Sequence, residues 1–275
     1  MEKRTNIYKI LCIVLLIILI VVLSMWGYTT LVEKSAVDEY QKLQPAVNTY
    51  SQQAAAESQD TQQTDELTNA NSTESTDTQI LPDIPQKNID WEELENINDD
   101  IYAWIYIPGT NIDYPVLQHP TDDSYYLEHN MDGSKGRPGC IYTEKANSKA
   151  FTDYNTIIYG HNMKSGAMFR TLHNFEDSTV FDTDKYVYIY TKEKVFIYEI
   201  FAAYTSDAGH ILYENKFDSA EHMQSYLEEA LKTAKFNGYV RDGVNVDGNS
   251  AIVTLSTCTT DSSERYLVQA VLINE

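Results

Sequence analysis

A cysteine and an arginine lie on either side of a predicted hairpin near the C-terminus. The stretch TLSTCTTDSSERYLV, residues 254–268, reads as a strand, a short polar loop and a second strand. If the two strands pair as antiparallel neighbours, Cys258 ends the first strand and Arg265 opens the second at the same end of the hairpin. Side chains alternate along a strand, so Ser256 shares the face of Cys258. A guanidinium beside a thiol stabilises the thiolate, and the pair therefore predicts nucleophilic chemistry at the mouth of a sheet.

A cysteine that cleaves an acyl bond also needs a group that protonates the leaving amine, and histidine does this most often. His161 is the candidate, because TIIYGHNM places it at the end of a buried strand, as Cys258 is placed. The other five histidines lie in polar loops or on a helix, where a solvated side chain is the simpler interpretation: His119, His129, His173, His210 and His222.

The elements that position these residues are mostly strands. Runs rich in Val, Ile, Tyr and Phe occur at residues 102–117, 155–161, 185–191, 194–205, 250–258 and 265–273. Two helices are predicted, one capped by Asp90 with Glu93 three residues on, and one over residues 218–236 behind an Asp218/Glu221 cap. Many strands without βαβ alternation predict a closed or nearly closed β-barrel, or a sandwich.

The N-terminus carries the pattern of a membrane anchor. Lys3, Arg4 and Lys9 precede an uncharged, almost wholly apolar stretch at residues 10–28. A helix crosses a bilayer with about 20 such residues, whereas the apolar region of a cleaved signal peptide has about 7 to 15. We therefore predict an uncleaved anchor at residues 1–28, with its positive flank in the cytoplasm and the rest of the chain outside.

A polar segment separates this anchor from the strand-rich region. Residues 29–87 form an extracytoplasmic stalk, and from residue 43 to residue 86 there is no Lys or Arg. Gln, Ser, Thr, Ala, Asn and acidic residues dominate there and bury too little apolar surface to fold. We expect a disordered acidic tether with a mean span of roughly 35 to 40 Å. Residues 88–275 then form one folded domain by length.

The net charge and the absence of certain motifs limit which partners and cofactors the sequence predicts. The formal net charge is −21, from 20 Lys and Arg against 41 Asp and Glu. Phosphate backbones are bound by clustered cations, so this balance argues against a nucleic-acid partner. The sequence has no glycine-rich phosphate loop and no paired-cysteine zinc pattern, and we expect neither a metal ion nor an organic cofactor.

The cysteines allow two interpretations. Cys12 lies in the apolar stretch, and Cys140 and Cys258 lie in the part predicted to be exported. A structural disulfide between these two is the default for an exported protein. A free nucleophile at Cys258 is the alternative.

Several motifs resemble the class B sortases. They are YGHNM at 159–163 and, about a hundred residues later, TLSTC at 254–258 with an arginine soon after it. DDSYYLEHN and GRPGCIYTE, ahead of the histidine, add to the resemblance, which covers residues 88–273. It implies a mainly β fold, an eight-stranded β-barrel with an N-terminal helix and a long helix between late strands. It also implies a cysteine transpeptidase anchored on the outer face of a Gram-positive cell membrane.

The resemblance assigns roles to individual residues. Cys258 is the nucleophile, His161 the general acid and then base, and Arg265 the group that orients the substrate and stabilises the oxyanion. Three further residues resemble contacts of the substrate: Ser256, Tyr159 and Leu127. The reaction implied is cleavage of a C-terminal sorting signal of a secreted protein at its threonine. The acyl group then passes through a cysteine thioester to an amine of the peptidoglycan peptide.

Two alternatives remain open. One is another thiol enzyme of the cell envelope. Papain-like hydrolases place Cys before His, the reverse of the order here, and L,D-transpeptidases carry a Ser-x-Gly-Cys stretch that is missing around Cys258. The other alternative is a tethered adhesion module in which Cys140 and Cys258 form a disulfide and Arg265 is a surface charge.

Overall fold

A computed structural model describes residues 2–57 and 81–274 of the 275-residue chain. In these residues nine strands form one sheet. They are β1 (Ile101–Tyr106), β2 (Asp113–Leu117), β3 (Ile141–Tyr142), β4 (Asn155–Tyr159), β5 (Tyr186–Tyr190), β6 (Val195–Asp207), β7 (Gly238–Val240), β8 (Ile252–Cys258) and β9 (Glu264–Leu272).

The sheet closes on itself. Its order is β5-β1-β2-β3-β4-β8-β9-β6-β7, and β5 also pairs with β6. Eight strands thus form a closed ring, and β7 pairs with β6 beside the closing β5. The prediction of an eight-stranded β-barrel is confirmed. Each of the eight ring strands therefore pairs with a neighbour on both sides.

The parallel pairing of β4 with β8 joins two parts of the sheet that are far apart in the sequence. β4 runs parallel to β8, with Ile157 opposite Thr254 and Tyr159 opposite Ser256. β8 pairs in turn with β9 as an antiparallel hairpin. The ends of β4 and β8 therefore point in the same direction and lie at the same mouth of the barrel.

The apolar residues separate into two cores. Val253, Leu255 and Val268 belong to the main cluster, while Ile252 and Leu267 belong to a second cluster under helix α6 (Ala220–Asn237). Alternation along β8 thus directs odd-numbered residues inward and even-numbered ones outward, toward α6. Ser256 and Cys258 consequently lie on the outer face of β8, the face of the second cluster under α6.

Two predicted helices form, and one has a different cap. The Asp90 side chain caps α2 (Trp91–Ile97) by accepting from the Glu93 backbone, as expected. The predicted Asp218 cap of α6 is wrong, because Ser219 occupies that position and accepts from the His222 backbone N–H. Serine in an extended conformation is a strong N-cap, and the Asp218 carboxylate instead contacts the His222 ring.

The remaining helices are short. They are α3 (Tyr125–Glu128), the 3₁₀ helix η2 (Phe169–Glu176), α4 (Ser178–Thr183) and α5 (Ile211–Glu214). α3 lies ahead of β3, η2 and α4 follow β4, and α5 follows β6. Each therefore lies in a connection between strands.

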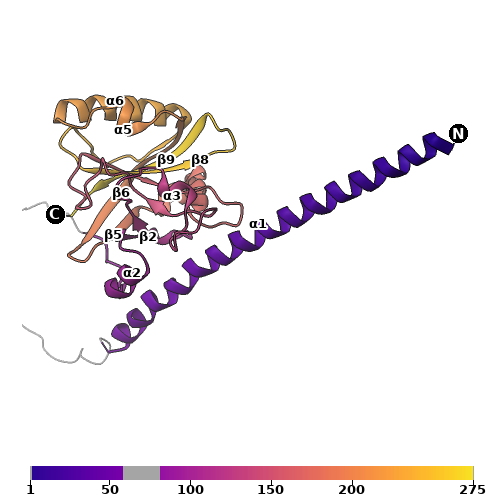
Figure 1. Cartoon of the computed structure of the whole chain (residues 1–275). Coiled ribbons are helices and arrows are strands. Elements are labelled where there is room, and N and C mark those ends of the chain that lie inside the picture. The colour runs from indigo at the N-terminus through magenta and orange to yellow at the C-terminus, as the bar shows by residue number, and fades with distance from the viewer. Residues whose placement is uncertain (1, 58–80, 275) are drawn as a thin grey trace, which may run out of the picture.

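The N-terminal helix α1 (Glu2–Glu57) is longer than the predicted membrane span and does not stop at it. It runs past the barrel and away from it (Figure 1). Its apolar part is long enough to cross a membrane by length and composition. Residues 43–57 of the segment expected to be a tether are part of this helix, and Gln, Ala and Glu readily extend an existing helix. The rest of the predicted tether, residues 58–80, lies outside the described residues.

Part of the predicted stalk packs on the barrel. Tyr40 of α1 is 2% exposed and belongs to the main core, and the Gln44 side chain donates to the backbone of Asp113. The chain meets the barrel again before α2, where Tyr190 donates to the carbonyl of Pro85 and Lys87 pairs with Asp113. Residues ahead of 88 therefore contribute to the packing of the folded unit.

Candidate active site

The hairpin register places Cys258 directly opposite Arg265, as the sequence predicted. Cys258 is the last residue of β8 and is partly exposed. One terminal nitrogen of the Arg265 guanidinium, Nη1, donates to the carbonyls of Ser262 at 3.1 Å and Glu264 at 2.8 Å. These bonds fasten the guanidinium to the loop that joins the two strands.

His161 lies just beyond β4, at the mouth where β8 also ends. The backbone N–H of Gly160 donates to the carbonyl of Ser256, and the Thr257 hydroxyl donates to the carbonyl of Gly160. The imidazole Nε2 lies 2.7 Å from the carbonyl oxygen of Leu127. A carbonyl only accepts, so Nε2 carries the hydrogen and Nδ1 is the nitrogen that can exchange a proton.

Burial sets the protonation preference of this ring. It lowers the pKa of His161, and the charge of Arg137 lowers it further, while the bond to the Leu127 carbonyl acts in the opposite direction. A neutral imidazole is therefore favoured over a wider pH range than in an ordinary histidine.

All six residues predicted for the site line one cleft of about 1270 Å³ on the outer side of β4 and β8. They are Cys258, His161, Arg265, Ser256, Tyr159 and Leu127. The far wall of this cleft comes from α5, α6 and the end of β6. A cleft of this size holds an extended peptide of several residues.

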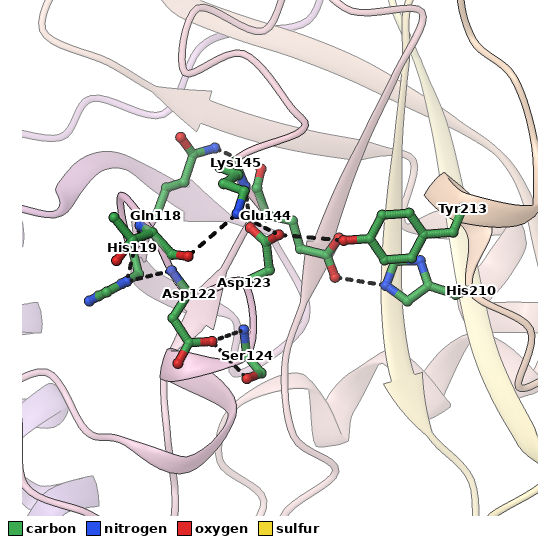
Figure 2. Close-up of polar contacts among 10 residues, drawn as sticks. Gln118, His119, Asp122, Asp123, Ser124, Glu144, Lys145, His210 and Tyr213 are labelled. Atoms are coloured by element: carbon green, nitrogen blue, oxygen red, sulfur yellow. Dashed lines mark hydrogen bonds and ion pairs between the residues drawn. The ribbon is translucent and has the colours of Figure 1, made fainter.

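A polar cluster that joins two walls of the cleft escaped the sequence analysis (Figure 2). The Glu144 carboxylate bonds to Nε2 of His210 at 2.9 Å, and the Tyr213 hydroxyl lies 3.4 Å from Asp123. The rings of His210 and Tyr213 stack with centroids 4.1 Å apart. Burial raises the pKa of Glu144, and the adjacent His210 partly offsets this effect. These contacts tie the α5 segment to the opposite wall of the cleft.

A second group contacts the backbone of Cys258 itself. The Asn162 amide donates to the Cys258 carbonyl at 2.7 Å, and Nε2 of His173 lies 3.0 Å from the same oxygen. Nδ1 of His173 pairs with Glu176 at 2.6 Å. The interpretation of His173 as a solvated histidine is wrong, because η2 folds back onto the end of β8 and leaves the side chain only 12% exposed.

Cys140 has entirely different surroundings. It is fully buried, its sulfur lies 3.1 Å from the Tyr40 hydroxyl and 3.4 Å from the carbonyl of His129, and burial raises the pKa of its thiol to about 12. Cys140 and Cys258 are both free. The disulfide on which the adhesion-module alternative depends is therefore not formed.

The described part of the chain contains no group of three His, Cys, Asp or Glu side chains arranged to hold a metal ion. The chemistry that this geometry offers is that of a thiol, an imidazole and a guanidinium in one cleft.

Comparison with known proteins agrees with this geometry. A family model described as "Sortase domain" matches residues 105–273. The chain is 35% identical over 189 residues to Sortase B of Listeria monocytogenes, covering 66% of this chain and 74% of that protein. It is 27% identical over 186 residues to Sortase B of Staphylococcus aureus, with the same coverage of both chains. The structure of Clostridium perfringens sortase B superposes with a TM-score of 0.60 at 34% identity, covering 66% of this chain and 99% of that one.

Proposed function

Because the chain belongs to the sortase family and is a class B cysteine transpeptidase, we propose that it cleaves a C-terminal sorting signal at its threonine. The acyl group then passes to an amine of the cell-wall peptide. The observation that carries this proposal is the convergence of Cys258, His161 and Arg265 in one peptide-sized cleft.

The first half-reaction forms a thioester. The Cys258 thiolate attacks the carbonyl carbon of the threonine, and the peptide C–N bond breaks as the tetrahedral intermediate collapses. On becoming a thiolate, Cys258 gives its proton to Nδ1 of neutral His161, since Nε2 is engaged with the Leu127 carbonyl, and the departing nitrogen then takes this proton. The released fragment leaves with a neutral amine, and His161 becomes neutral.

The second half-reaction reverses these roles. The incoming amine attacks the thioester, neutral His161 accepts its extra proton at Nδ1, and the Cys258 sulfur leaves as a thiolate. A new amide bond joins the threonine carbonyl to the cell-wall peptide. Atoms and charge balance over the two steps without a further reactant.

Arg265 acts on the attacked carbonyl. Its guanidinium carries five N–H donors in a rigid fork, and Nη1 serves the loop carbonyls of Ser262 and Glu264. We assign the remaining N–H groups to the oxygen on which negative charge develops. Anchoring Nη1 to the loop orients the fork before the substrate arrives.

The substrate contacts are proposed from position in the cleft. Ser256 and Tyr159 are register partners on β8 and β4, and Leu127 is the residue whose carbonyl holds His161. An extended signal peptide laid along the ends of these strands would contact all three. The structure of a Staphylococcus aureus sortase B–substrate complex, 29% identical with a TM-score of 0.59, has the same fold and covers 67% of this chain.

The location follows from helix α1. Its apolar stretch at residues 10–28 spans the membrane, the positive N-terminal flank stays in the cytoplasm, and the barrel lies outside the cell. In this arrangement the secreted substrate and the cell-wall amine are both on the side of the cleft.

A peptide-cleavage experiment tests the proposal. The full chain in detergent is incubated with a library of peptides of the Asn-Pro-x-Thr and Pro-x-Thr-Gly types together with a small primary amine. The expected product ends at threonine and carries the added amine by mass spectrometry, and Cys258→Ala makes none. Cleavage that persists in Cys258→Ala, or cleavage at residues other than threonine, would overturn the assignment.

A further inference from the structure

The backbone carbonyl of Cys258 is held from outside β8 by two side chains. The Asn162 amide nitrogen lies 2.7 Å from the carbonyl oxygen and His173 Nε2 lies 3.0 Å from it, while these two nitrogens are 3.0 Å apart. Cys258 is the last residue of β8, so this contact lies where the strand gives way to the loop. Neither side chain is needed for the chemistry described above.

His173 is itself fixed from several elements. Its Nδ1 pairs with Glu176 of the same helix η2 at 2.6 Å. Its ring stacks on Tyr266 of β9 with centroids 4.9 Å apart and an interplanar angle of 23°. Tyr266 is the register partner of Thr257, the residue before Cys258. Arg170 supports the other member of the pair by donating to the Asn162 side-chain oxygen at 3.2 Å.

The hydrogen-bond roles depend on which ring nitrogens carry a hydrogen. When Nε2 carries one, it donates to the Cys258 carbonyl, which only accepts, and that oxygen then has two donors. When only Nδ1 carries one, it donates to the Glu176 carboxylate, and Nε2 accepts from the Asn162 amide that also donates to the Cys258 carbonyl. His173 therefore holds the Cys258 carbonyl either directly or through Asn162.

We propose that His173 is a positioning residue that fixes the end of β8, and with it the Cys258 sulfur relative to Arg265. This role rests on the proposed function, in which Cys258 is the nucleophile. The contacts of Asn162 and His173 with this carbonyl hold the peptide plane after Cys258 and prevent the strand end from fraying into the loop. A displacement of about 1 Å at a reacting atom lowers rates by about 10²-fold, so these contacts act on the chemical step.

The groups that face His173 are Glu176 from η2, the Tyr266 ring from β9 and the Cys258 carbonyl from β8, together with the side chain of Asn162. Three elements therefore hold the ring against the end of β8.

The test compares single-turnover thioester formation by the full chain and its variants, with His222→Ala as the matched control. His222 on α6 is also paired with a carboxylate, that of Asp218, and is not among the residues lining the cleft. We expect His173→Ala to lower the acylation rate at saturating peptide about 10- to 100-fold with KM within twofold of wild type. His222→Ala should match wild type.

Two further variants separate positioning from general stability. His173→Gln, whose amide can donate to the Cys258 carbonyl, should recover part of the rate that His173→Ala loses. Glu176→Gln changes a 57% exposed side chain and removes the carboxylate that pairs with Nδ1 and orients the ring, so it should lower the rate about 3- to 10-fold even if His173→Ala fails to fold.

The outcomes are distinguishable. An acylation rate within twofold of wild type in both His173→Ala and Glu176→Gln overturns the proposal, as does an effect confined to KM. A His173→Gln rate no higher than that of His173→Ala overturns the role of His173 as a hydrogen-bonding positioning residue. Wild-type turnover by Cys258→Ala would instead show that the proposed function is wrong.

Discussion

The two free cysteines of the barrel occupy opposite kinds of environment. Cys258 ends a strand at the barrel mouth, is partly exposed and lies opposite Arg265. Cys140 is fully buried against Tyr40, and burial raises the pKa of its thiol to about 12. The same side chain is a candidate nucleophile in one place and an inert packing group in the other. Reactivity therefore depends on which strand end and which cations the fold brings to the sulfur.

The largest expected difference between the two thiols is in turnover. Cys258→Ala should abolish product formation because the attacking atom is removed. Cys140→Ser should keep most of it, since only volume and a weak hydrogen bond change there. Product formation from a signal peptide with an added amine measures both variants. Equal losses would remove the distinction between the two sites.

His161→Ala tests whether turnover at Cys258 depends on proton transfer by His161. Without the imidazole the leaving amine departs unprotonated, and turnover should decrease about 10²- to 10⁴-fold. The acylation rate in a single turnover measures this directly. His129→Ala is the control near Cys140. The His129 ring stacks on Tyr125, and the His129 carbonyl contacts the Cys140 sulfur.

Arg265 distinguishes charge from geometry at the reactive thiol. Arg265→Lys and Arg265→Ala should both lower kcat/KM by about 10²-fold or more, because lysine supplies charge without the planar fork. Alkylation of Cys258 by a small neutral reagent should slow far less in the lysine variant, since it needs mainly the positive charge. Near-native turnover with lysine would show that Arg265 acts only as a local charge.

Tyr40 tests why Cys140 is inert. Tyr40→Ala should expose the Cys140 thiol to alkylation and lower the free energy of unfolding by about 3 to 5 kcal/mol. Tyr40→Phe keeps the ring and loses the bonds to Gly139 and Cys140, so it should cost about 0.5 to 1.5 kcal/mol. Thiol labelling in a Cys258→Ala background and urea unfolding measure the two effects. Unchanged labelling in Tyr40→Ala would mean that the barrel alone buries this thiol.

The smallest expected effect is a pH dependence of the free energy of unfolding that arises from His161. The pKa of His161 is lower in the folded chain than its unfolded value of about 6.5. The unfolded state therefore binds the proton first, and the free energy of unfolding decreases as pH falls from about 7 through the folded pKa. His161→Gln should reduce this decrease between pH 7.5 and pH 5 in urea titrations. An identical decrease in the variant would assign it to other groups.

The features that could be predicted from the sequence are those that depend on consecutive strands or on a repeating side-chain pattern. The hairpin between β8 and β9 needs only consecutive strands, so the pairing of Cys258 with Arg265 followed from the chain order. Alternation predicted that Ser256 shares the face of Cys258. The strand pattern left a barrel and a sandwich open, and the eight-stranded barrel and the role of His161 came from resemblance, because the parallel β4–β8 pairing joins strands far apart in the chain and leaves no local pattern.

Other features depend on contacts that no local pattern encodes. His173 reads as a polar loop residue until η2 folds against β8 and β9. Glu144 and His210 meet across the cleft from opposite walls, 66 residues apart in sequence. Tyr40 lies in a segment whose composition is that of a stalk, and only its partner surface on the barrel explains its burial.

Helix α1 acts as a spacer of fixed length. With residues 10–28 in a bilayer, the helix rises 1.5 Å per residue from the outer membrane surface near Tyr28 to its docking point at Tyr40, a height of roughly 18 Å. A flexible tether would let the cleft wander through a shell of several tens of ångströms. In the membrane arrangement proposed above, a docked helix keeps the cleft close to the lipid headgroups, so its reach into the cell wall is short.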